Sequence, residues 1–392
     1  MRVPFLDLRA QEPEVGAALR EAVGEVLTSQ QCVLGPVVER FEQAMAAYAG
    51  VRHAIGVGSG TDALALAMAA LDVGPGQLVA TSAFTFFATA STIVRLGARP
   101  LFVDIDPHTF AIDPAALAAA IDAAPGPVAG VVPVHLYGRL APMAEIRAVA
   151  ARHGSWVVED AAQAIGARGS DGMAGTLGRA GCLSFYPTKN LGGIGDGGMV
   201  LTADDGIASR VRRDRHQGMT APYRHESIGL CSRLDAVQAA ALRAKLPWLD
   251  RWNDQRRAIA ARYAAALEAA GLTRERGGPL VAPAPAGAAH VFHQYVVRAE
   301  RRDRLAAHLA ARGIGTHVYY PIPLHRQPAL AAHAVVPVPL AHTERAVAEV
   351  LALPIYPQLP AAHVDCVVDA IAAFYRGSGR DAPRVEGGGI AR

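Results

Sequence analysis

Two lysines, Lys189 and Lys245, supply all the side-chain amines of this 392-residue chain, because the other members of its 38 basic residues are arginines. A lysine amine forms a Schiff base with an aldehyde most readily where cationic or apolar surroundings lower its pKa. Lys189 follows an apolar segment within the glycine-rich stretch SFYPTKNLGG, which is a poor position for a surface salt bridge. Lys245 lies beside Arg243 in a helical pattern, and we expect it on a solvated helix face. Lys189 is therefore the candidate for covalent chemistry.

A carboxylate ends another apolar segment. Asp160 is the last residue of WVVED, and a carboxylate that ends a buried strand needs a partner. A protonated ring nitrogen is one such partner, and the N-terminus of a following helix is the alternative. Gln163 lies three residues further on and points the same way if a helix begins there.

The stretch GSGT at 58–61 follows an apolar segment and opens a helical pattern. Free N–H groups and the helix dipole at such a position favour a phosphate, which Gly60 and Thr61 would contact. The alternative role for Thr61 is that of a helix N-cap. Ser184, five residues before Lys189, offers a hydroxyl as a further phosphate donor.

An amine, an acid and phosphate donors at the ends of successive strands match the needs of pyridoxal phosphate (PLP). This cofactor requires an amine for its aldehyde, a carboxylate for its ring nitrogen and donors for its phosphate. It also needs a flat partner for its ring, and Phe86 is the candidate. The alternative for Phe86 is a place in the hydrophobic core.

Other site classes find no support in the sequence. GVGSG at 56–60 lacks the GxGxxG spacing, no GxxxxGK[ST] occurs, and the 14 histidines show no metal-ligand spacing. The four cysteines lie far apart without a CxxC pair, which argues against zinc and a disulfide framework. A net charge of +3 gives no reason to expect nucleic acid. No secretory signal or membrane-spanning run is visible, so we expect a protein of the reducing cytoplasm.

The candidate cofactor residues must be positioned by the strands and helices around them. Along the chain, short apolar runs alternate with alanine-rich helical stretches. We expect strands at 78–82, 100–104, 128–136, 156–160, 181–186 and 198–202. Runs that are apolar on both faces are typical of a mainly parallel sheet covered by helices. The predicted fold class is thus α/β, with side chains for a ligand gathered at the carboxyl ends of the strands.

The alternation of predicted strands and helices ends near residue 236, where a long helical pattern runs from 234 to 270 with a break at Pro247. A linker-like stretch, a further strand and more helices follow. We expect a large PLP-binding domain at 1–250, a smaller α+β domain at 251–376 and a flexible tail at 377–392.

Nine motifs, in order along residues 3 to about 375, resemble the DegT/StrS family of PLP-dependent sugar aminotransferases. They are VPFLDL at 3–8, GSGTDA at 58–63, FTFFATA at 84–90, FVDID at 102–106, PVHLYG at 133–138, EDAAQA at 159–164, SFYPTKNLGG at 184–193, SRLDAVQA at 232–239 and YPIPLHRQP at 320–328. The resemblance implies the fold-type-I architecture of aspartate aminotransferase.

The resemblance also implies roles for the matching residues. Lys189 would form the Schiff base and shuttle protons, Asp160 would hold the pyridinium nitrogen, and Gln163 would contact the phenolic oxygen of the ring. Gly60, Thr61 and Ser184 would bind the phosphate, and Phe86 would stack on the ring. Arg233 would come from the opposite subunit, which implies a homodimer with shared active sites.

The sequence departs from the family pattern at three places, one of which is a slightly irregular helix-start pattern at 215–218. Cys231 stands where the family usually has an asparagine that reaches the phosphate across the dimer interface, and cysteine is a weak donor. Tyr319 stands where the family usually has histidine in a His-Tyr-Pro sequence, so that Tyr319 and Tyr320 would form the sugar contacts.

The implied reaction moves an amino group from glutamate to the keto group of a nucleotide-linked sugar, through a Schiff base at Lys189. The run 232–252 followed by Tyr319 and Tyr320 suggests the deoxysugar enzymes of antibiotic pathways. One alternative is an aminotransferase for an inosose. Others are a non-transaminating PLP sugar enzyme such as a dehydratase, whose known examples replace the lysine, and a non-catalytic sensor that uses the fold.

Overall fold

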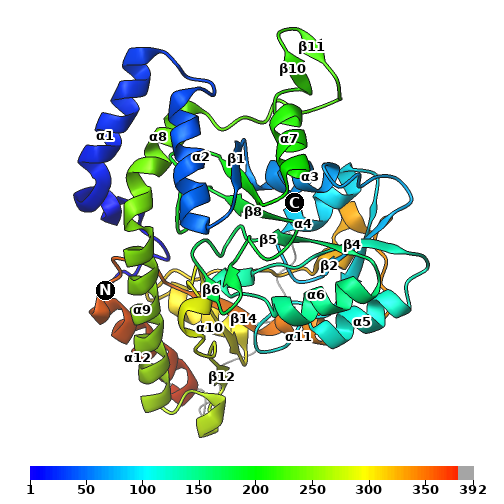
Figure 1. The fold of residues 1–392 in the computed structure, drawn as a ribbon. Coiled ribbons are helices and arrows are strands. Elements are labelled where there is room, and N and C mark those ends of the chain that lie inside the picture. The colour runs from blue at the N-terminus through cyan, green and yellow to red at the C-terminus, as the bar shows by residue number, and fades with distance from the viewer. Residues whose placement is uncertain (378–392) are drawn as a thin grey trace, which may run out of the picture.

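The structure is a computed structural model, and it describes residues 1–377 (Figure 1). Of the tail predicted at 377–392, residues 378–392 lie outside the described residues. Within residues 1–377, the main sheet has seven strands and a second sheet has three. No helix within these residues has the length and apolar character needed to cross a bilayer.

The main sheet is mostly parallel, as predicted. Its strands, in spatial order, are β1 (His53–Val57), β9 (Gly198–Thr202), β8 (Ala180–Ser184), β5 (Trp156–Asp160), β4 (Val128–Val132), β2 (Leu78–Ser82) and β3 (Arg99–Val103). Only β9 among these runs antiparallel to its neighbours. Consequently β1, β8, β5, β4, β2 and β3 all end at one edge of the sheet.

Three strand predictions need correction. The strand expected at 181–186 ends two residues early, at Ser184. The apolar segment before Gly58 forms β1, which we had not assigned as a strand. The strand expected at 128–136 ends at Val132, and a turn of 3-10 helix follows at Leu136–Gly138. Pro133 explains the early end, because it has no N–H to donate to a neighbouring strand.

Helices cover both faces of this sheet, because alternate strand residues point to opposite sides. On β2, Val79 packs in the cluster that includes α3 (Gly60–Ala69), α4 (Phe87–Arg95) and α7 (Asp205–Asp214). Leu78 and Ala80 pack in the cluster that includes α5 (Pro114–Asp122) and α6 (Met143–Arg152). The apolar runs are therefore buried on both sides.

Two further helices complete this part of the molecule. α2 (Pro36–Ala49) and α8 (Ala236–Lys245) share a core cluster with Leu183, Met199 and Leu201 of β8 and β9. α1 (Glu12–Ser29) lies beside α8 at the outer edge (Figure 1).

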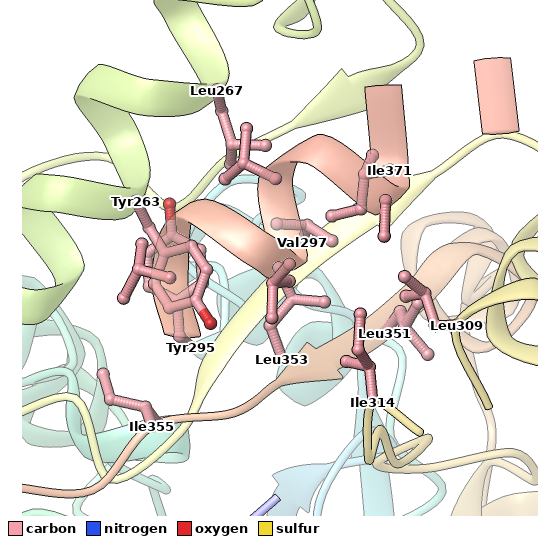
Figure 2. Packing of buried hydrophobic residues seen from close by; sticks show 14 of the residues in the cluster. Tyr263, Leu267, Tyr295, Val297, Leu309, Ile314, Leu351, Leu353, Ile355 and Ile371 are labelled. Carbon is pink, nitrogen blue, oxygen red and sulfur yellow. The ribbon is translucent and has the colours of Figure 1, made fainter. Parts of the chain in front are cut away.

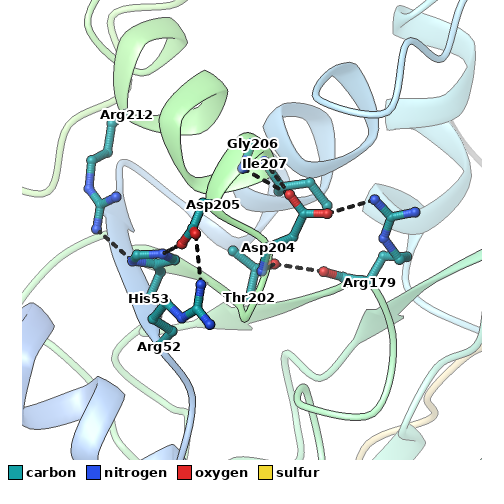
Figure 3. Close-up of polar contacts among 9 residues, drawn as sticks. All are labelled: Arg52, His53, Arg179, Thr202, Asp204, Asp205, Gly206, Ile207 and Arg212. Carbon is teal, nitrogen blue, oxygen red and sulfur yellow. Dashed lines mark hydrogen bonds and ion pairs between the residues drawn. The ribbon is translucent and has the colours of Figure 1, made fainter.

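Polar contacts fix the edge of the sheet where β1 and β9 meet α7 (Figure 3). Asp204 caps α7 by accepting from the N–H groups of Gly206 and Ile207, at 2.9 and 3.0 Å. Arg179 Nη2 lies 2.7 Å from Asp204 Oδ2. Each N-cap of this kind stabilises a helix by about 1 kcal/mol.

The C-terminal part is built on the antiparallel sheet β12 (Leu280–Val281), β13 (Tyr295–Ala299) and β14 (Val350–Leu353). α9 (Leu249–Ala269), α10 (Arg302–Ala310) and α12 (Ala361–Gly377) share a core with this sheet (Figure 2). The rings of Tyr263 and Tyr295 stack there at 4.8 Å. Each fully buried leucine, such as Leu351 or Leu353, contributes about 1.5–3 kcal/mol.

The helical pattern predicted at 234–270 breaks at Pro247, as expected: α8 ends at Lys245, and a 3-10 turn, Leu246–Trp248, leads into α9. α9 crosses the predicted boundary between residues 250 and 251, and the division into two domains stays a prediction. The remaining helix, α11 (Ala341–Glu349), is tied to the main sheet by Asp104, which accepts from the N–H groups of His342 and Thr343.

Candidate active site

A cavity of about 500 Å³ opens at the edge where the parallel strands end. β5 contributes Asp160, its last residue, and β8 contributes Ser184, its last residue. Such an edge is where ligands bind in α/β sheets. The predicted site residues that line the cavity are Gly60, Thr61, Phe86, Asp160, Gln163, Ser184, Lys189, Tyr319 and Tyr320.

Lys189 lies in a tight loop between β8 and β9. Its own N–H donates to the Tyr186 carbonyl at 2.8 Å, and the Gly193 N–H donates to the Phe185 carbonyl at 2.8 Å. A side chain at Gly192 would place its Cβ 2.2 Å from the Pro187 carbonyl oxygen, so the loop requires glycine there. Burial lowers the pKa of the Lys189 amine from 10.5 to about 8, although the Asp160 carboxylate opposes this shift. A substantial neutral fraction near pH 8 suits a nucleophilic amine.

The prediction that Lys245 lies on a solvated face is wrong. Lys245 is 8% exposed, and its Nζ donates to the Gly192 carbonyl at 2.8 Å. The helical pattern of α8 was read correctly, but the loop after Lys189 covers the face that carries Lys245. The second lysine therefore supports the loop of the first.

Asp160 is buried and accepts only neutral donors. Thr89 Oγ1 donates to its Oδ2 at 2.8 Å, and the Ala162 N–H donates to its Oδ1 at 3.2 Å. Burial raises the pKa of the Asp160 carboxyl, while these hydrogen bonds and Lys189 oppose the shift. No helix begins at Asp160, so the alternative role at a helix N-terminus is wrong. Asp160 forms no ion pair within 4 Å among residues 1–377, and a protonated ring nitrogen would supply a positive partner in direct contact.

The adjacent Glu159 points to the opposite side of β5 and serves the fold. It is fully buried and accepts from His135 Nε2 at 2.8 Å and from the N–H groups of Gly175, Leu177 and Gly178. The alternation of a strand thus separates one structural carboxylate from one that faces the cavity.

The start of α3 offers free donors to the cavity. Ser59 is the N-cap, and its hydroxyl accepts from the Asp62 N–H at 3.1 Å, so the alternative that Thr61 caps the helix is wrong. The first N–H groups of a helix have no partner within it, and those of Gly60 and Thr61 form no hydrogen bond within residues 1–377. A Cβ on Gly60 would lie 2.8 Å from Ser184 Cβ, which shows how closely the two predicted phosphate contacts approach.

Phe86 precedes α4, and 57% of its surface is exposed, so the alternative of a core aromatic is wrong. Its ring centroid lies 6.1 Å from that of Tyr320. Gln163 accepts from the Tyr137 N–H at 2.6 Å and donates through Nε2 to the Tyr320 hydroxyl at 3.3 Å. Tyr137 in turn donates its hydroxyl hydrogen to the Tyr319 carbonyl.

Cys231 and Arg233 do not line the cavity of this chain. Cys231 is exposed, and the Arg233 guanidinium lies 2.9 Å from both Cys231 Sγ and His216 Nδ1. The structure contains one copy of the chain, in which these two residues contact each other.

Three residues near the site were missed. Thr89 follows Phe86 by three residues, a helical spacing that could have placed it on the side of the cavity. His293 and Gln294 also line the cavity, but they lie about a hundred residues from Lys189 in sequence, and no local pattern marks them.

Comparison with known proteins agrees with this geometry. The family model described as DegT/DnrJ/EryC1/StrS aminotransferase family matches residues 13–372. The chain is 48% identical, over 96% of its length and 99% of the relative, to a pleiotropic regulatory protein of Geobacillus stearothermophilus. It is 44% identical, over 94% of its length and 95% of the relative, to a dTDP-3-amino-3,4,6-trideoxy-alpha-D-glucose transaminase of Streptomyces venezuelae.

Among solved structures, S. venezuelae DesV in complex with a ketimine intermediate superimposes with a TM-score of 0.89. The two chains are 43% identical, and the match covers 95% of this chain and 98% of DesV. The family model and both relatives extend over nearly the whole chain, including every strand that ends at the cavity. The chain belongs to the DegT/DnrJ/EryC1/StrS aminotransferase family.

Proposed function

We propose that the protein is a PLP-dependent aminotransferase that moves an amino group from glutamate to the keto group of a nucleotide-linked deoxysugar. One observation carries the proposal: a single cavity brings the Lys189 amine, the Asp160 carboxylate and the free N–H groups that begin α3 to one place. The name of the S. venezuelae relative, a dTDP-sugar transaminase, supports the substrate class.

The residues present fit PLP. Asp160 is buried and forms no ion pair within 4 Å in the described chain, and Gly60, Thr61 and Ser184 offer donors suited to a phosphate. Lys189 offers an amine with a lowered pKa. When bound, PLP supplies an aldehyde carbon that accepts amino groups and a ring that withdraws electrons from the adjacent carbon.

Several side chains of the cavity then have separate roles in the proposed reaction. The Asp160 carboxylate holds the proton on the ring nitrogen, and Thr89 orients that carboxylate through its hydrogen bond. Lys189 Nζ would take a proton from one carbon of the reacting centre and return it to another. Burial lowers the pKa of this amine to about 8, which favours the neutral form that accepts a proton. Phe86 and Tyr320 flank the cavity and restrict the orientation of the ring and sugar.

We also propose that the active unit is a homodimer. Large apolar side chains stay exposed beside the cavity in Phe86, Tyr186 and Ile194, and on the β10–β11 hairpin (Met219–Ala221 and Arg224–His225) Tyr223 is 97% exposed. A second copy would cover these groups, since large exposed apolar patches mark association sites. In this arrangement Arg233 reaches the partner's cavity. Mixing Lys189→Ala with Arg233→Ala protein should then restore activity through hybrid dimers, whereas independent sites would give none.

Turnover assays test the reaction itself. Glutamate added to the PLP-loaded protein should convert the cofactor to its amine form, which is visible as a change in absorbance. The amine form should then react with one of a panel of keto sugars: dTDP-3-keto, dTDP-4-keto and UDP-4-keto sugars and scyllo-inosose. If the amine form reacted with scyllo-inosose alone, the substrate would be a cyclitol and not a nucleotide-linked sugar. No conversion with any donor would refute the proposal.

A non-catalytic role has one observation in its favour, the regulatory name of the G. stearothermophilus relative. The presence of Lys189 and Asp160 in one cavity weighs against it, because a sensor has no need of a covalent amine. Bound PLP without turnover toward any donor would support the regulatory role.

A further inference from the structure

A second cavity, of about 290 Å³, lies beside the main one and shares walls with it. Thr188, His293, Gln294 and Tyr319 line both cavities. Thr188 directly precedes Lys189, so the second cavity adjoins the loop that carries the reactive amine. We call it the side cavity; Arg256 of α9 forms its inner wall.

Arg256 carries a buried positive charge that no carboxylate neutralises. Its side chain is 3% exposed, and no ion pair involves it in the described chain. Nη1 donates to the carbonyls of Phe292, His293 and Ile355 at 3.1–3.3 Å. Burial lowers the pKa of this guanidinium. A buried charge of this kind is costly unless it is paired, which points to an anion from outside the chain.

One nitrogen of Arg256 remains for a carboxylate oxygen. Nε is buried without a partner and sealed from solvent, so a ligand in the cavity does not reach it. No hydrogen bond involves Nη2 within residues 1–377, and a guanidinium N–H donates a charge-assisted hydrogen bond to a carboxylate oxygen. Since Nη1 is held by three carbonyls, the direction of Nη2 is fixed.

Two neighbours complete a polar wall. Gln294 is 7% exposed and lines both cavities, and its side-chain amide N–H is the group that would donate to a carboxylate oxygen. His293 is 9% exposed, and its Nδ1 donates to Asn190 Oδ1, since the Asn190 amide nitrogen donates to Asn253 and Val291. The second nitrogen, Nε2, is therefore a bare acceptor, which suits the ammonium group of an amino acid.

We propose that the side cavity binds the carboxylate of the amino donor, with Arg256 and Gln294 as its recognition residues. This inference rests on the proposed aminotransferase function. The donor's reacting carbon must lie at Lys189, and its carboxylate groups must then lie within a few bonds of that amine. A cavity that shares four lining residues with the cavity of Lys189, and that contains a guanidinium without an ion pair, meets this requirement. A carboxylate could instead belong to an acidic keto sugar, and the experiment below separates these sources.

Glutarate is the probe, because it has the two carboxylates of a dicarboxylic donor but no amino or keto group to react. Calorimetry on the PLP-loaded protein should detect glutarate binding to the wild type. Arg256→Met should weaken it about 10- to 100-fold, the range expected when a charged hydrogen-bonding partner is removed. Arg262→Met is the matched control, because Arg262 lies on the same helix in an exposed ion pair with Asp365. It should leave binding unchanged.

The half-reactions identify the source of the carboxylate. Arg256→Met should raise the glutamate concentration needed for half-maximal conversion about 10-fold or more, and leave the reaction of the amine form with keto sugar unchanged. An effect on the keto-sugar step alone would assign the carboxylate to the sugar and overturn the proposal. If Arg256→Met does not fold, Gln294→Leu and Arg256→Lys should each weaken glutarate binding several-fold.

Equal glutarate binding by all variants, or none by the wild type, would overturn the side cavity as a carboxylate site. Glutarate binding that depends on Arg256 in a protein without transaminase activity would leave the carboxylate site standing and refute the proposed function instead. The two failures are therefore distinguishable.

Discussion

Lys245 Nζ donates a hydrogen bond of 2.8 Å to the carbonyl of Gly192, three residues after Lys189. The chain's two lysines thus serve one loop, with one amine facing the cavity and the other holding the backbone that carries it. Burial lowers the pKa of both amines, but Lys189 is only partly buried and lines the cavity, whereas Lys245 is buried against the Gly192 carbonyl.

Lys189→Ala should remove the visible absorbance band of the lysine-bound cofactor and reduce turnover to background. The variant removes the amine that the aldehyde requires, but it leaves the strands intact. Spectra and single-turnover assays on protein incubated with PLP measure both effects. Lys245→Met is the control and should keep the band; turnover of Lys189→Ala at the wild-type rate would contradict the assignment.

Lys245→Met should destabilise the protein by about 1–3 kcal/mol, because it leaves the Gly192 carbonyl without its buried donor. Urea unfolding of the cofactor-free protein measures the loss. Arg243→Met, an exposed position on the same helix, should change the free energy of unfolding by less than about 0.5 kcal/mol. Equal stabilities for the two variants would show that the hydrogen bond contributes nothing.

Thr89→Val should lower turnover about tenfold or more and shift the absorbance of bound PLP. The variant loses the 2.8 Å hydrogen bond that orients Asp160, a contact with a charged group worth about 1.5–3 kcal/mol. Thr89→Ser keeps the hydroxyl and should restore the spectrum. Thr92→Val is matched in burial and helix, but Thr92 bonds only to backbone carbonyls of α4 and should have no spectral effect. A wild-type spectrum in Thr89→Val would rule out the positioning role.

Stability without cofactor should rise between about pH 8 and 10 through Lys189. The folded chain releases this proton near pH 8, whereas the unfolded chain retains it up to about 10.5, so the unfolded state binds more protons in that window. Urea unfolding at pH 7.5 and 10 should show a larger gain for the wild type than for Lys189→Met. The same gain in both proteins would mean that burial of this amine does not penalise its charged form.

Gly60→Ala should weaken PLP binding about tenfold or more. Its Cβ would lie 2.8 Å from Ser184 Cβ and would crowd the start of α3, where the phosphate donors converge. Equilibrium dialysis of PLP gives the affinity directly. Gly74→Ala adds the same methyl group where no atom lies within 4 Å and should bind PLP like the wild type. An unchanged affinity in Gly60→Ala would place the phosphate elsewhere.

The sequence predicted local features of the site well. A strand that ends in Asp160, a glycine-rich loop around Lys189 and a helix that begins near Gly60 each follow from apolar runs and turn residues close in sequence. The roles inferred for single polar residues were less secure: Ser59 and not Thr61 caps α3, and Lys245 is buried. A cap depends on the backbone angles of one residue, and burial depends on what packs against a helix from elsewhere.

The sequence by itself determined the fold class, the family and the one amine suited to covalent chemistry, because these depend on residue types and on periodicities that local segments express. Only the tertiary structure decided which distant side chains meet: Thr89 with Asp160, Lys245 with Gly192, and Arg256 with the cavity beside Lys189. Such pairs join segments tens of residues apart, and their contacts arise from the order of strands in the sheet and the packing of helices upon it.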